Sequence, residues 1–106
     1  MLLGGGVAFE WDDDKNKTNL KKHGISFETA TRVFSDPFAV QEQDRFEDGE
    51  ARWQTTGIAS GVSVLVVAHA FRDRDNIEAI RIISARRALP LERKRYEKAK
   101  YRQIRI

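Results

Sequence analysis

Arginine, histidine and tyrosine side chains supply the chemistry that this sequence could perform. Cleavage of RNA without a metal ion needs a group that deprotonates a ribose 2′-hydroxyl. It also needs cations that stabilise the charge developing on phosphorus, and a group that protonates the leaving oxygen. The residues that stand out for these tasks are Arg81, Arg86, His69, His23 and Tyr96. These five residues are the candidate catalytic groups.

Arg81 stands out first because it interrupts a run of isoleucines in a segment that otherwise has the pattern of a buried strand. A lone guanidinium in such a place is costly. Arg81 therefore either pairs with a carboxylate, such as that of Glu10 or Glu28, or projects from a sheet face toward a phosphate. The sequence favours neither alternative.

Both histidines also have structural explanations. His69 lies near the end of the most apolar predicted strand, where a histidine is more often a core or rim residue. Whether it shares a sheet face with Arg81 depends on the register of the turn at residues 72–76. His23 follows Lys22 at the end of the first predicted helix, where cations bind the last carbonyls and favour the helix dipole.

Metal and cofactor sites are not indicated. The chain has no cysteine, which excludes a thiolate zinc site. Residues 12–23 begin like a calcium loop, but Lys17 stands where the loop needs glycine and His23 where it needs glutamate. Phosphate loops and dinucleotide fingerprints are absent from the sequence. We expect no metal and no cofactor.

Charge is distributed unevenly along the chain. Residues 1–50 carry a net charge of −5 and residues 51–106 a net charge of +8, and ten Lys or Arg side chains lie in the last 26 residues. Such asymmetry indicates a polyanionic partner, although a solvated basic helix explains it as well. The candidate RNA-contacting residues are Arg52, Arg72, Arg87, Arg93, Lys94 and Lys22.

The 106 residues have room for one domain. We predict a short first strand over residues 7–11, a helix capped by Asp12 that ends at Gly24, and a second helix capped by Ser26. Four antiparallel strands follow over residues 39–44, 52–58, 62–71 and 77–84, and a basic helix runs from Pro90 to about residue 102. This order predicts an α+β domain over residues 7–106, with residues 1–6 outside the fold.

The sequence also predicts a location. The longest apolar run, residues 64–68, is too short to span a bilayer. The N-terminus shows no secretory signal. Without cysteine no disulfide can form. We expect a cytoplasmic protein that does not bind membranes.

Several motifs together are similar to those of a known family. They are Phe9-Glu10-Trp11-Asp12, Lys22-His23-Gly24-Ile25-Ser26-Phe27, Arg81-Ile82-Ile83-Ser84-Ala85-Arg86-Arg87, and Glu92-Arg93 with Tyr96-Glu97. From about Phe9 to Glu97 the sequence resembles the BrnT family, the toxin half of bacterial BrnT/BrnA toxin–antitoxin pairs.

The resemblance implies a RelE-like fold with a curved antiparallel sheet. It also implies a ribonuclease that blocks translation without a metal cofactor. Its partner would be a BrnA antitoxin that neutralises it and carries the DNA-binding domain, so operator DNA would be contacted only through the complex. The alternative function is a non-catalytic regulatory module that binds nucleic acid or a protein partner, and RNA turnover distinguishes the two.

Overall fold

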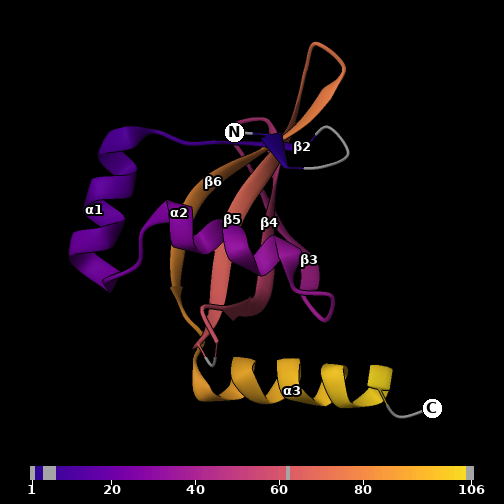
Figure 1. The fold of residues 1–106 in the computed structure, drawn as a ribbon. Helices are drawn as coiled ribbons and strands as arrows, with labels where there is room; N and C mark the ends of the chain where they lie inside the picture. The colour runs from indigo at the N-terminus through magenta and orange to yellow at the C-terminus, as the bar shows by residue number, and fades with distance from the viewer. Residues whose placement is uncertain (1, 4–6, 62, 105–106) are drawn as a thin grey trace.

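A computed structural model describes residues 2–3, 7–61 and 63–104. The strands form one sheet in the order β1-β2-β6-β5-β4-β3, helices α1 and α2 lie against one face, and α3 runs along one end (Figure 1). The strands are β1 (Leu2–Leu3), β2 (Val7–Glu10), β3 (Val40–Glu47), β4 (Glu50–Ala59), β5 (Ser63–Arg74) and β6 (Ile77–Arg87). The helices are α1 (Asp13–His23), α2 (Phe27–Ala30) with the 3-10 turn η1 (Thr31–Ser35), and α3 (Pro90–Ile104).

The predicted antiparallel meander is confirmed for β3 to β6. The strands extend beyond the predicted limits. β5 and β6 meet at a two-residue turn, Asp75 and Asn76, both of which have positive φ. Such a turn matches the twist of a hairpin, which explains why the strands extend into the polar run at residues 72–74. The register that follows determines which side chains share a face.

The sheet is mixed, because β2 pairs in parallel with β6. The predicted antiparallel pairing holds for the four-stranded meander but not for the short first strand, which joins the sheet in parallel. The meander leaves one side of β6 unpaired, and β2 occupies it. Leu2 and Leu3 in turn pair antiparallel with β2, although residues 1–6 were expected to lie outside the fold. Residues 1 and 4–6 lie outside the described residues.

Helix α1 begins and ends as predicted. The Asp12 side chain accepts hydrogen bonds from the backbone at the first turn, and Gly24 has a φ of 71° at the C-terminal end. Leu20, the one aliphatic residue of α1, is 51% exposed. The buried residue is instead Asn19, whose amide bonds both the N–H and the carbonyl of Ala85. The hydrogen bonds of Asn19 therefore hold α1 beside β6.

The hydrophobic core lies between the sheet and the segment formed by α2 and η1. Phe27, Ala30 and Val33 are fully buried there against Val67 and Ile82. The opposite face of the sheet, which we call the open face, carries no helix along most of its length (Figure 1). The prediction of an α+β fold is confirmed, and the RelE-like relationship stays a prediction. No helix in the described ranges is both long and apolar enough to cross a membrane.

Candidate active site

Strand alternation brings three of the predicted arginines together on the open face. Arg52 lies on β4, Arg72 on β5 and Arg81 on β6. Phe71 and Ile80 precede Arg72 and Arg81 in the sequence. They pair with each other across β5 and β6 and face the core. Because successive side chains of a strand point to opposite faces, the three guanidinium groups lie on the side without helices.

Glu50 connects the three arginines. Its carboxylate lies 3.4 Å from the Arg52 guanidinium, 3.5 Å from that of Arg72 and 3.7 Å from that of Arg81. The four side chains remain partly accessible, with exposed fractions between 15% and 36%. We call these four residues the arginine cluster.

The contacts within the arginine cluster are ion pairs longer than ordinary hydrogen bonds. A hydrogen bond from nitrogen to oxygen spans 2.7–3.2 Å as a rule, and all three distances to Glu50 exceed that range. Arg52 also lies 3.7 Å from Glu47 and 3.9 Å from Asp48, and Arg72 lies 3.9 Å from Glu10. None of these contacts has the length of an ordinary hydrogen bond, so the guanidinium groups can still donate to a ligand. Such donors suit a phosphate, which arginine can bind in a bidentate manner.

A hollow of about 360 Å³ adjoins the arginine cluster. Arg72 and Arg81 line it together with Glu10, Trp11 and Asp12 at the junction of β2 and α1. Arg81 was expected either to pair with a carboxylate or to face a phosphate. It pairs with Glu50, while Glu28 accepts a hydrogen bond from Asn16. Arg81 also lines an open hollow, so the pairing does not prevent it from meeting a ligand.

His69 lies on the core face, away from Arg81. Arg81 pairs with Ala70 in the β5–β6 ladder, and His69 pairs with Ile82. The imidazole is fully buried, its Nε2 lies 2.8 Å from the Thr55 hydroxyl, and the rings of Phe34 and Phe71 pack against it. Burial lowers its pKa from 6.5 to about 4. This position argues against proton transfer to RNA by His69.

Tyr96, another candidate for proton transfer, anchors α3. It is the buried residue of that helix, and its hydroxyl donates a hydrogen bond to the Asp36 carboxylate. Asp36 also accepts from the backbone N–H groups of Phe38 and Ile58. Burial and the bond to Asp36 raise the pKa of the Tyr96 hydroxyl, which therefore stays protonated and bound to Asp36.

Arg86 is held by α3. Its guanidinium donates two hydrogen bonds to Glu92, of 2.7 and 2.9 Å. These bonds lower the pKa of Glu92 to about 2 and raise that of Arg86. Because the bidentate pair occupies donors that a phosphate would need, Arg86 is better placed to attach α3 to β6 than to bind RNA.

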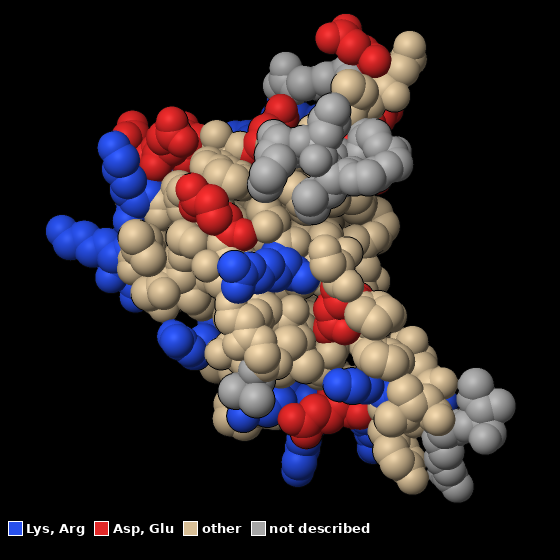
Figure 2. Space-filling view, viewed as in Figure 1, with Lys and Arg blue, Asp and Glu red and all other residues tan. Residues whose placement is uncertain are grey.

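The remaining predicted residues lie near the other end of the sheet. The Arg87 guanidinium approaches the carbonyl of His23 at 3.4 Å, and Lys22 is exposed beside it at the end of α1. Arg93 and Lys94 are exposed on α3. Figure 2 shows Lys and Arg side chains gathered around α3 at the lower end of the molecule. The structure does not bring these residues into the arginine cluster.

Sequence reasoning missed Glu50, the residue at the centre of the arginine cluster. One predicted strand ended at residue 44 and the next began at Arg52, which left Glu50 outside both. The structure begins β4 at Glu50. Since Glu50 and Arg52 are two residues apart in one strand, extending the strand by two residues would have placed both on the same face.

Comparison with known proteins identifies the family. Residues 11–92 match the family described as the ribonuclease toxin BrnT of type II toxin–antitoxin systems. The chain belongs to the BrnT family. The match includes every residue of the arginine cluster and ends within α3, two residues after its start.

A solved structure supports the fold. The crystal structure of the Brucella abortus ribonuclease toxin BrnT superposes with a TM-score of 0.54 at 24% sequence identity, covering 78% of this chain and 96% of that one. No curated protein matches the chain. As a member of the family, the chain is a ribonuclease toxin of a type II toxin–antitoxin system, which implies an RNA substrate and an antitoxin partner.

Proposed function

We propose that the arginine cluster is the active site of a metal-independent endoribonuclease. The observation that carries the proposal is the placement of three guanidinium groups around the Glu50 carboxylate on the open face. A carboxylate can accept a proton, and guanidinium groups can neutralise a phosphate during attack. One cluster therefore offers both functions.

In this mechanism Glu50 accepts the proton of a ribose 2′-hydroxyl as that oxygen attacks the adjacent phosphorus. The new P–O2′ bond forms while the P–O5′ bond breaks, and the leaving 5′-oxygen takes a proton from water. Arg81 and its neighbours Arg52 and Arg72 donate to the phosphate oxygens as negative charge accumulates on them. The products are a 2′,3′-cyclic phosphate and a 5′-hydroxyl.

Basic side chains outside the arginine cluster would guide the RNA backbone. Arg87 and Lys22 lie near the end of β6, and Arg93 and Lys94 lie on α3. Contacts of this kind raise affinity for any sequence and weaken with salt. By cleaving RNA in the cytoplasm the protein would inhibit translation.

The partner would be a BrnA-like antitoxin that covers the open face and the exposed side of α3. Such a partner would present acidic and apolar residues, because α3 exposes Leu91 and Tyr101 among lysines and arginines. Operator DNA would be bound only by the complex, with the antitoxin supplying the DNA-reading element. Co-expression of the two proteins should relieve toxicity and yield a complex that co-purifies.

Turnover tests the proposed activity. Purified protein is incubated with RNA in EDTA, with and without ribosomes, and new ends are examined for the 2′,3′-cyclic phosphate. We expect cleavage by the parent and at least 100-fold slower cleavage by Glu50→Gln, the scale typical of removing an essential general base. Arg32→Ala is the control, because Arg32 bonds Ser60 and lies outside the arginine cluster. Intact RNA under all conditions would favour the non-catalytic module instead.

A further inference from the structure

A second pocket, of about 230 Å³, lies where α3 meets the open face, and the proposed chemistry does not use it. Its polar lining comes from three elements: Glu42 on β3, Gln54 and Thr56 on β4, and Arg95 and Glu92 on α3. Glu92 already accepts two hydrogen bonds from Arg86. Val40 and Tyr96 contribute apolar surface. A concave site with an apolar wall and a few convergent polar groups is the usual form of a small-ligand site.

The polar groups of this pocket other than Glu92 are available for a ligand. Among the described residues, the Glu42 and Gln54 side chains form no hydrogen bond or ion pair. Arg95 forms no hydrogen bond in the same part of the chain, and its charge acts on Glu92, whose pKa it helps to lower. The pocket therefore offers a free carboxylate, a free amide and a guanidinium with donors to spare.

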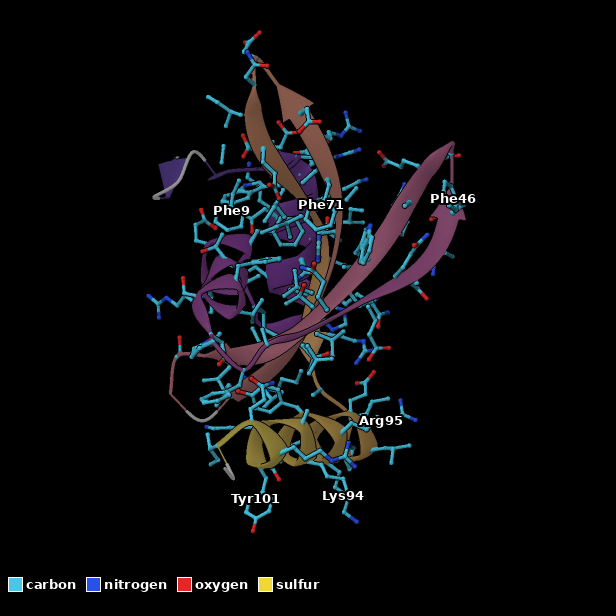
Figure 3. All side chains as sticks on the ribbon, turned by 90° about the vertical axis from the view of Figure 1, so that its right-hand side faces the viewer. Phe9, Phe46, Phe71, Lys94, Arg95 and Tyr101 are labelled. Carbon is cyan, nitrogen blue, oxygen red and sulfur yellow. The ribbon has the colours of Figure 1, made fainter. Side chains whose placement is uncertain are left out.

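Strand β4 links the pocket to the arginine cluster. Arg52 belongs to the cluster, and Gln54 and Thr56 follow on the same face at every second residue. Each such step is about 7 Å along a strand. Figure 3 shows Arg95 on the side of α3 near the sheet, whereas Lys94 and Tyr101 point away from it. An RNA strand whose phosphate lies at the cluster can place a neighbouring base in the pocket.

We propose that this pocket binds one unstacked guanine base of the RNA, with Glu42 and Arg95 as the residues that select it. The inference rests on the proposed RNA cleavage. Guanine presents two adjacent donors, N1–H and the N2 amino group, which match the two oxygens of a carboxylate. Its O6 and N7 acceptors match a guanidinium. Adenine, cytosine and uracil lack the adjacent pair of donors. Proteins commonly read single-stranded RNA through such splayed bases.

Binding of RNA that cannot be cleaved tests the pocket. Four fluorescent pentanucleotides with 2′-fluoro sugars differ only in the central base, and fluorescence anisotropy gives their affinities. We expect the guanine oligomer to bind about tenfold or more tightly than the others, the discrimination that one bidentate base contact provides. Equal affinities, or a preference for another base, would overturn the proposal.

Variants of the pocket residues show which side chains select guanine. Glu42→Gln should reduce the guanine preference to about threefold or less, since one acceptor is replaced by a donor. Gln43→Ala is the matched control, because Gln43 pairs with Trp53 rather than with Gln54 across β3 and β4.

Arg95→Ala should lower the preference for guanine, whereas Lys94→Ala should weaken the binding of all four oligomers equally. A guanine preference that remains as large in Glu42→Gln as in the parent would exclude this pocket. Because the oligomers lack the 2′-hydroxyl, the result does not depend on catalysis, and cleavage without base preference would reject only this inference.

Discussion

Two pairings of arginine with glutamate differ in how many hydrogen-bond donors they leave free. In the arginine cluster, Glu50 lies 3.4–3.7 Å from three guanidinium groups and forms hydrogen bonds with none of them. Near α3, Arg86 donates two bonds of 2.7 and 2.9 Å to Glu92. Loosely paired donors can turn to a phosphate, whereas a bidentate pair is already satisfied. An arginine on the open face is therefore a candidate for catalysis only if its donors are free.

Substitution of the two arginines tests this difference most directly. Arg81→Ala should lower RNA cleavage by about 100-fold or more while thermal unfolding changes little, because the side chain is expected to act mainly on the transition state. Arg86→Ala should lower the unfolding midpoint and affect cleavage less, because it leaves Glu92 without its partner. Cleavage rates and melting curves of both variants give the answer. If Arg81→Ala cleaves like the parent, Arg81 is not in the active site.

Acid should weaken the fold through His69, which is buried in the core. The imidazole titrates near 6.5 when unfolded and about 4 when buried, so between these values the unfolded chain binds the extra proton. Stability should be fully present above pH 6.5 and fall as the pH drops toward 4. The loss should reach about 2 kcal/mol at pH 5.

Urea unfolding at pH 7 and at pH 5 measures this loss. His69→Leu is the control, because it removes the titrating group and puts an apolar side chain in its place in the core. Its free energy of unfolding should change much less between the two pH values than that of the parent. An equal change in both proteins would assign the acid sensitivity to other groups.

Tyr96 is the buried side chain that attaches α3, together with the Arg86–Glu92 pair, whereas the strands that carry the arginine cluster are joined by backbone hydrogen bonds. Tyr96→Phe removes the hydroxyl that donates to Asp36 and should cost about 1.5 kcal/mol of stability, near the lower end for a bond to a charged group. Asp36 keeps its bonds from Phe38 and Ile58, which limits the loss. Lys98→Ala, on the exposed side of the same helix, is the control for chemical denaturation. Equal stability of the two variants would show that Tyr96 does not anchor α3 through its hydroxyl.

Local signals predicted most of the elements, and non-local contacts explain what they missed. The cap at Asp12, the left-handed Gly24 and the alternation of β4 to β6 all depend on residues close in sequence. The parallel pairing of β2 with β6 and the bond between Asp36 and Tyr96 join residues at least 60 positions apart. Composition and spacing carry little information about such contacts.

Local signals also selected several residues of the candidate site, and non-local contacts decide how they are arranged. The sequence selected Arg52, Arg72 and Arg81, which the structure brings together, but the register of the β5–β6 turn was needed to separate them from His69. A polar run at residues 72–76 fits either a five-residue or a two-residue turn, and the two place His69 on different faces relative to Arg81. The structure has the two-residue turn, and in it the His69 imidazole packs against Phe34 and Phe71.

The smallest expected effect concerns the exposed side of α3, where Lys94 and Lys98 form no ion pair with any residue that the structure describes. Lys94 and Lys98 line a shallow surface beside Leu91 and Tyr101. Exposed charges mainly steer association, so replacing both lysines by alanine should slow binding of an acidic antitoxin a few-fold at low salt and leave its dissociation rate nearly unchanged. Leu91→Ala should do the reverse, because apolar contacts act on dissociation. Surface plasmon resonance at two salt concentrations separates the rates. If neither substitution changes either rate, the antitoxin does not contact this side of α3.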